Sequence, residues 1–143
     1  MADKLSGQWE TDQEHGKNEN FKKYHTAIGL GADVVDQFSK VRDALEYEIN
    51  GTKMTCKVLI GGKVIKTYDD IEEGKEVSIE GVDGKPCLFC YRIKNGKWVE
   101  TYKPGDGKGI EVETTKVVNG NKLTITHNIV GKDIAYTYTA TKK

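Results

Sequence analysis

The sequence lacks the features that define several large classes of protein. Lys and Arg together number 22 and so do Asp and Glu, so the formal net charge is zero and no basic field indicates a nucleic-acid partner. No run approaches the roughly 20 apolar residues of a membrane span, and the opening MADKLSGQWE lacks the apolar stretch of a secretory leader. We therefore expect a soluble, cytoplasmic protein with a single domain over residues 1–143.

Cysteine is scarce as well, and the three that occur, Cys56, Cys87 and Cys90, favour a reducing compartment over a disulfide framework. Cys87 and Cys90 match C-x-x-C, but they sit in CLFCYRI, which reads as a strand. Positions three apart in a strand face opposite sides and cannot jointly bind a metal ion. We expect no metal site and no cofactor.

Motifs of established catalytic mechanisms are missing too: G-x-S-x-G, H-E-x-x-H, a P-loop and a paired Cys and His nucleophile. Chemistry by Tyr and Glu inside a barrel stays open as an alternative, although the sequence places no acid and base at a working separation. The chain is expected to bind rather than to catalyse.

Turn signals, in contrast, are abundant after residue 50 and recur roughly every 8 to 12 residues with one longer interval, which is typical of an antiparallel meander. They are Asn50-Gly51, Gly61-Gly62, Glu73-Gly74, Asp83-Gly84, Asn95-Gly96, Asn119-Gly120 and Gly131-Lys132. The segments between them are rich in β-branched and aromatic residues, and with the opening GQWETDQ they predict ten strands. The expected strands are 7–13, 44–49, 54–60, 63–68, 76–80, 87–93, 98–103, 110–118, 122–129 and 134–140.

The segment 18–40 has a helical pattern instead. In NENFKKYHTAIGL the apolar residues recur at helical spacing, as Phe21, Tyr24, Ala27 and Ile28. Asn18 or Asn20 is the expected N-cap of this helix. ADVVDQFSK predicts a second short helix with Asp33 as its cap. The apolar face of this second helix is Val34, Val35 and Phe38.

Ten short antiparallel strands in series predict an all-β, up-and-down barrel, because closure removes unpaired edges. At this size side chains alone do not fill the interior, so a ligand cavity is expected. The helix pair, inserted between the first two strands, is expected to cover one open end of the barrel.

The start of the chain resembles the intracellular lipid-binding proteins, the fatty-acid- and retinoid-binding family. The family pattern is G-x-W, a short spacer, then N-[FY]-x-x-[FY]-x-x-x-[IL]-G. The matching positions are Gly7, Trp9, Asn20, Phe21, Tyr24, Ile28 and Gly29. The late NGNKLTIT hairpin matches as well, so the similarity extends over essentially the whole chain.

The resemblance implies a flattened clam that holds one or two hydrophobic molecules beneath a helical lid. Members that hold a carboxylate typically end with R-x-Y on the last strand and carry a second Arg two strands earlier. Here the R-x-Y positions are Tyr136 and Tyr138, and the second Arg falls at or beside Thr115. The only arginines of the chain, Arg42 and Arg92, lie elsewhere, so both anchors are missing.

The loss of both arginines changes the expected head group. A confined anion needs a fixed cation or several donors, whereas a phenol donates one hydrogen bond and no charge. A polar, uncharged cluster is therefore expected, and it suits an alcohol, aldehyde or ester. The full set of expected ligand-binding residues is Tyr136, Tyr138, Thr115, His127, Tyr24, Val34, Phe38 and Ile125.

Two alternatives stay open at these positions. Tyr136 and Tyr138 can be ordinary core residues with satisfied hydroxyls. The strand register of 109–118 leaves either Glu111 and Glu113 or Val112 and Thr114 facing inward, because a slip of one residue swaps the two faces.

Two functions follow as hypotheses. The leading one is intracellular carriage of a small hydrophobic ligand by a monomer whose helical lid touches membranes transiently during transfer. The alternative is an abundant protective protein, because some heat-soluble proteins of desiccation-tolerant animals look like members of this barrel family. A charged content of 31% and a mean hydropathy of −0.61 are compatible with that role.

Overall fold

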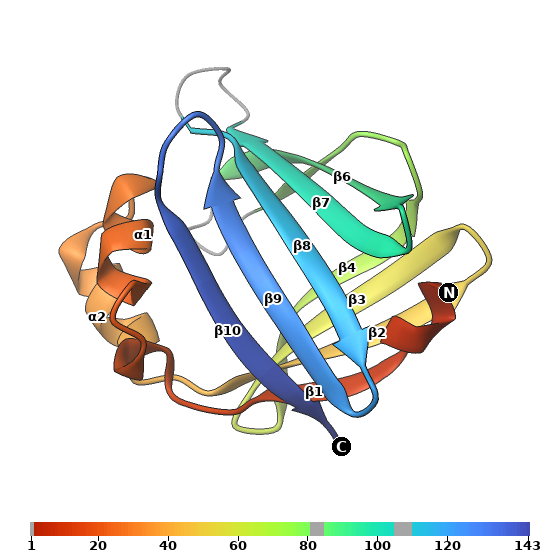
Figure 1. Cartoon of the computed structure of the whole chain (residues 1–143), viewed down its shortest axis with the longest axis horizontal. Helices are drawn as coiled ribbons and strands as arrows, with labels where there is room; N and C mark the ends of the chain where they lie inside the picture. The colour runs from red at the N-terminus through yellow and green to blue at the C-terminus, as the bar shows by residue number, and fades with distance from the viewer. Residues whose placement is uncertain (1, 81–84, 105–109) are drawn as a thin grey trace.

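The strands form one antiparallel sheet that curls into a nearly closed barrel (Figure 1). The structure, a computed structural model, describes residues 2–80, 85–104 and 110–143. The strands are β1 (Gly7–Thr11), β2 (Asp43–Asn50), β3 (Lys53–Ile60), β4 (Lys63–Glu72), β5 (Val77–Glu80), β6 (Pro86–Lys94), β7 (Lys97–Pro104), β8 (Val112–Asn119), β9 (Lys122–Ile129) and β10 (Ala135–Lys142). Short 3-10 segments lie at Ala2–Leu5 and His15–Lys17.

The sheet order is β4-β3-β2-β1-β10-β9-β8-β7-β6-β5, so every hydrogen-bonded neighbour but one pair is consecutive in sequence. The pair of β1 with β10 closes the barrel, as Trp9 opposite Lys142 illustrates. In the described residues β4 and β5 are the two ends of this order, and no backbone ladder joins them. The ten expected strands are confirmed, while the expected turn at Asp83-Gly84 lies outside the described residues.

The two helices, α1 (Phe21–Ala27) and α2 (Ala32–Ser39), lie together on one side of the barrel next to β10 (Figure 1). The expected cap at Asp33 is wrong, because α2 begins after Gly31 and Asp33 lies within its first turn. With seven and eight residues, the described helices fall far short of what a membrane crossing requires.

Alternation along the strands divides inner from outer side chains and produces two apolar clusters. The larger one lies within the barrel and includes Trp9, Leu45, Leu123 and Ile125. The smaller one lies beneath the helices. Its buried members are Phe21, Tyr24, Val35, Val112, Ile129 and Tyr136. Since Val112, Ile129 and Tyr136 lie near the ends of three adjacent strands, the helices cover that end of the barrel.

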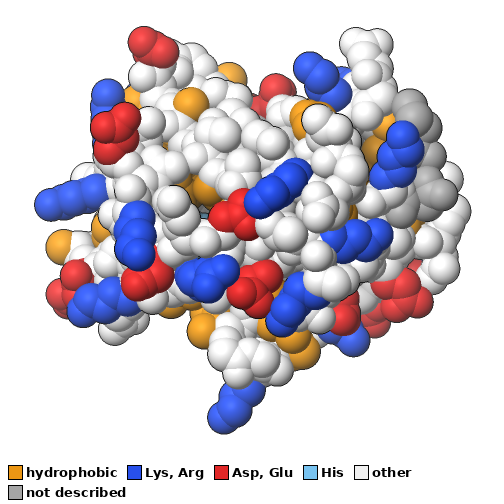
Figure 2. All heavy atoms as spheres, turned by 60° about the horizontal axis from the view of Figure 1, so that its bottom comes forward, with side chains coloured by type: hydrophobic (Ala, Val, Ile, Leu, Met, Phe, Trp, Pro, Cys, Tyr) orange, Lys and Arg blue, Asp and Glu red, His pale blue; other side chains and the backbone are white. Residues whose placement is uncertain are grey.

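The outer surface mixes charges of both signs. Figure 2 shows Lys and Arg side chains interspersed with Asp and Glu over one face of the molecule. Exposed ion pairs such as Arg42 with Glu10 and Lys57 with Glu46 belong to this pattern. That face offers no single-sign field of the kind that attracts polyanions.

Candidate ligand site inside the barrel

Tyr136 and Tyr138 both face the interior, as the sequence predicts. Along β10 buried and exposed positions alternate, and Tyr136 is 1% exposed. Tyr138 is half-buried and packs against both apolar clusters, so it lies where they meet. The two phenol rings are 5.2 Å apart between centroids.

The Tyr136 hydroxyl is already engaged. It lies 2.6 Å from Nδ1 of His15, whose Nε2 lies 2.8 Å from Oδ1 of Asp43. A carboxylate accepts hydrogen bonds, so Nε2 of His15 donates to Asp43. Burial raises the pKa of Tyr136 above its ordinary value, with a further contribution from Asp43. Tyr136 is therefore a neutral phenol whose hydroxyl is committed to His15, consistent with the alternative of a core tyrosine with a satisfied hydroxyl.

The Tyr138 hydroxyl is different, because no described residue forms a hydrogen bond with it. Among the described residues no fully buried side-chain oxygen or nitrogen is left without a partner. The Tyr138 oxygen must therefore retain accessible surface, although it projects from the inner face of the barrel. Burial raises the pKa of this phenol well above its ordinary value, so it is a neutral donor on the inner face of the barrel.

A buried ion pair that sequence reasoning missed lies deeper in the barrel. Lys116 of β8 and Glu100 of β7 are 3.0 Å apart between Nζ and Oε2, and their side chains are 6% and 2% exposed. Glu100 also accepts hydrogen bonds from Trp98 Nε1 at 2.8 Å and from the Tyr102 hydroxyl at 2.7 Å. Lys116 donates to the Tyr47 hydroxyl and lies 4.7 Å from the centre of that ring. The interior thus holds a buried pair of opposite charges.

Thr115 does not line the interior of the barrel, because the structure places it on the outer face of β8. Its neighbours Thr114 and Lys116 are buried, and its cross-strand partners are Val99 and Thr126. The expectation that Thr115 faces the ligand is therefore wrong by one residue. Of the two open registers, the one with Val112 and Thr114 inward is observed.

His127 faces inward beside Tyr136, as expected, and shares a 2.7 Å hydrogen bond with the Thr114 hydroxyl. Burial lowers its pKa to about 3, and the nearby positive charge of Lys116 adds to that effect. His127 is therefore neutral at physiological pH and adds no cation to the site. Its ring stacks against Tyr24 with 5.5 Å between centroids.

The remaining expected residues fall in two groups. Tyr24 and Phe38 belong to the apolar contacts beneath the helices, and Ile125 is fully buried in the inner cluster. Val34 is partly buried on α2 but does not appear in either cluster, so it is not brought together with the others. No group of three His, Cys, Asp or Glu residues in the described ranges is arranged to hold a metal ion.

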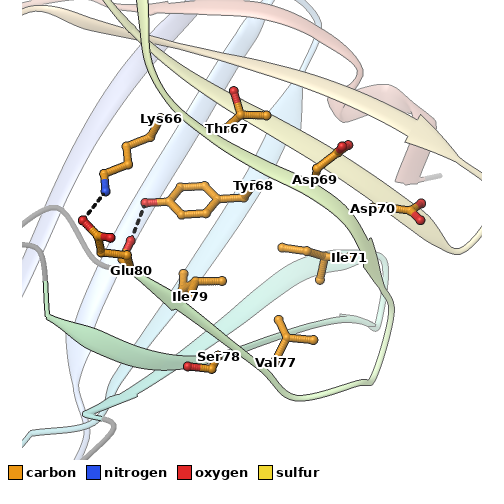
Figure 3. A pocket seen from close by; sticks show the side chains of 10 residues that line it. All are labelled: Lys66, Thr67, Tyr68, Asp69, Asp70, Ile71, Val77, Ser78, Ile79 and Glu80. Carbon is orange, nitrogen blue, oxygen red and sulfur yellow. Dashed lines mark hydrogen bonds and ion pairs between the residues drawn. The ribbon is translucent and has the colours of Figure 1, made fainter.

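The gap between β4 and β5 holds a cavity of about 440 Å³ (Figure 3). Ile71, Val77 and Ile79 line it, and all three also pack in the inner apolar cluster. Two contacts bridge the gap to Glu80: Lys66 pairs with its carboxylate at 2.9 Å, and the Tyr68 hydroxyl donates to its backbone carbonyl at 3.1 Å. Side chains thus join the two strands where no backbone ladder does.

A ten-stranded antiparallel barrel, capped by two short helices and lined by apolar and polar side chains, defines the fold class of the intracellular lipid-binding proteins. No protein-family model matches the chain. It is 28% identical over 108 residues to liver-type fatty acid-binding protein of Takifugu rubripes, covering 76% of this chain and 80% of that protein. It is also 28% identical over 119 residues to liver fatty acid-binding protein of Mus musculus, covering 82% and 85%.

Solved structures agree with the fold. Apo lipid binding protein 8 of Caenorhabditis elegans matches with a TM-score of 0.84 at 16% identity, covering 100% of this chain and 98% of that one. Secretory abundant heat soluble protein 4 of Ramazzottius varieornatus matches with a TM-score of 0.79 at 15% identity, covering 97% and 94%. At such identities the likeness concerns the fold alone. Together with the sequence relatives, it confirms the resemblance to the intracellular lipid-binding family.

Proposed function

We propose that this protein binds and carries a small hydrophobic ligand in its barrel without catalysing a reaction, and that the ligand has a neutral head group. Its sequence relatives are named for fatty-acid binding, which supports lipid carriage in general. The alternative of a protective protein rests on fold likeness alone, which carriers share, and is not favoured.

The hydrocarbon tail of the ligand would supply most of the binding affinity. Inner-face side chains that keep some accessible surface, such as Val58, Val118 and Tyr138, would contact it. Each CH₂ group removed from water contributes roughly 0.8 kcal/mol, so a long acyl or isoprenoid chain needs only modest help from its head group.

The observation that carries the neutral head group is the Tyr138 hydroxyl, an inward donor with no hydrogen-bond partner among the described residues, on the same inner face as the buried pair of Lys116 and Glu100. An alcohol, aldehyde or ester oxygen can accept one hydrogen bond from this phenol. A carboxylate would bring a charge into a confined space where the buried lysine Lys116 is already paired.

The test is displacement of an environment-sensitive fluorescent lipid from the full chain by oleyl alcohol, retinol, oleate and retinoic acid. We expect the two alcohols to compete at least tenfold more strongly than the two acids. Size-exclusion chromatography would check the expected monomer in the same samples. Stronger competition by the acids, or no binding of any probe, would refute the proposal.

A further inference from the structure

Lys116 lies beside the proposed head-group position. Across the sheet, Lys116 of β8 is paired with Ile125 of β9, and Ile125 is paired with Tyr138 of β10. All three side chains point inward, so across the sheet only Ile125 lies between the lysine and the phenol that has no hydrogen-bond partner among the described residues. A cation at this place is within reach of a ligand whose oxygen contacts Tyr138.

The Glu100 carboxylate already pairs with the Lys116 ammonium. It lies two residues from Trp98, the residue of β7 opposite Lys116, and it receives hydrogen bonds from Lys116, Trp98 and Tyr102. Such a carboxylate has nearly all its acceptor sites filled. The protein therefore supplies from its own chain the carboxylate that a fatty acid would otherwise bring.

We propose that Glu100 is the specificity-determining residue of the barrel, which excludes anionic lipids by holding Lys116 in a buried pair. This inference rests on the proposed carriage of neutral lipids. A fatty-acid carboxylate must either enter beside a neutral pair or displace Glu100. Displacement leaves Glu100 buried and charged without its partner, which is strongly unfavourable. Lys116 is thus a latent anion site that Glu100 keeps closed.

Glu100→Gln tests this directly. Glutamine has nearly the same shape, and its carbonyl oxygen still accepts from Trp98 or Tyr102. It removes the charge that neutralises Lys116, so oleate gains a partner and oleyl alcohol does not. We expect the ratio of Kd for oleate to Kd for oleyl alcohol to fall at least tenfold relative to wild type. Oleate should also raise Tm more in this variant than in wild type.

Two controls accompany the variant. Glu113→Gln makes the same change at an exposed, outward position of β8 and should leave the ratio unchanged. In the double variant E100Q/K116Q the gain for oleate should disappear, because the cation is gone as well. A gain that persists in the double variant would show that Lys116 is not the anion site.

Glu100→Gln leaves a buried lysine without its partner and can fail to fold. Tyr138→Arg then serves as the second variant, because it adds a cation beside the intact pair. It should bind oleate at least tenfold more tightly than wild type, and a variant that still rejects oleate would overturn charge compensation as the determinant.

The outcomes separate the two proposals. If wild type prefers alcohols and neither variant gains oleate binding, the role of Glu100 is wrong and the proposed function stands. If wild type already binds oleate tightly, both proposals are wrong. If wild type binds neither class while E100Q binds oleate, Glu100 excludes anions but neutral-lipid carriage fails.

Discussion

His15 and Tyr136 share a hydrogen bond of 2.6 Å between the ring Nδ1 and the phenol oxygen, across 121 positions of sequence. His15 lies in the segment between β1 and the helices, and its other ring nitrogen contacts Asp43 at the start of β2. The Asn18 side chain in the same segment donates to the Thr137 carbonyl at 2.6 Å. The helical cover is thus fastened to strands β2 and β10 by polar side chains.

Tyr136→Phe should therefore weaken this attachment rather than the head-group contact. It removes one hydrogen bond and leaves His15 Nδ1 without a partner, so we expect the free energy of unfolding to fall by about 1 to 2 kcal/mol. Urea denaturation would measure this, and amide exchange of residues 15–39 should accelerate. Thr137→Val, on the outer face of the same strand, is the matched control. An unchanged stability with a tenfold loss of ligand affinity would contradict this assignment and return Tyr136 to the head-group site.

Tyr138→Phe should have the opposite signature. Its hydroxyl forms no hydrogen bond with the described residues, so stability should change by less than about 0.5 kcal/mol. Affinity for a fatty alcohol should fall by about 1 kcal/mol, the scale of one net hydrogen bond, or roughly fivefold. Isothermal titration with oleyl alcohol and with a hydrocarbon of equal length would separate head from tail. Equal losses for both ligands would assign Tyr138 to tail packing instead.

The fold could be predicted because its signals are local. Glycine turns and alternation placed every strand to within a few residues, and Tyr136, Tyr138 and Ile125 lie on strands whose two faces differ clearly. β8 offered no such contrast: in VETTKVV polar residues occupy both faces, so alternation does not fix which one is inside. Thr115 was misplaced for that reason.

The ion pair of Glu100 and Lys116 could not be predicted for a different reason. Each residue, taken alone in WVETYK or TTKVV, reads as an ordinary solvated charge of a strand. Only the register of β7 against β8, with Trp98 opposite Lys116, brings the two together on the inner face. The useful signal was the alternation of side chains along each strand. Glu100 lies on the same face as Trp98, and Lys116 lies on the same face as Val112.

A carboxylate outside the barrel should make stability depend on acidity. Asp12 accepts hydrogen bonds of 2.5 Å from Thr139 and Thr141 and pairs with Lys122. These contacts lower the pKa of Asp12 from 3.8 to about 2, the threonine hydrogen bonds contributing most. The ionised form therefore stabilises the folded state above pH 3.8, and this contribution is lost as pH falls towards 2.

Asp12→Asn should accordingly cost about 1 kcal/mol at pH 7, because the site is partly exposed and solvent screens it. The difference from wild type should shrink as pH falls from 3.8 and should vanish only below about pH 2, where Asp12 is protonated in both states. Guanidinium unfolding of both proteins at several pH values would measure this difference in the free energy of unfolding. A difference of constant size across the range would mean that the amide disturbs packing and not a charge.

The buried His127 should make the stability of the fold depend on pH in a second way. Burial lowers its pKa from 6.5 to about 3. Between these pH values His127 is therefore protonated in the unfolded chain and neutral in the folded state. The folded state is then disfavoured by up to about 1.4 kcal/mol per pH unit as pH falls towards 3. His25, whose pKa burial also lowers, adds to the same trend.

His127→Gln should flatten this slope, because glutamine keeps a polar group near Thr114 without binding a proton. Thr114→Val is the matched control: it removes the 2.7 Å hydrogen bond but leaves the titrating ring, so it should lower stability at every pH and keep the slope. Urea midpoints between pH 7 and 4 would measure all three proteins. Equal slopes for wild type and His127→Gln would mean that His127 is protonated in the folded barrel, and Lys116 would then have a second cation beside it in the ligand site.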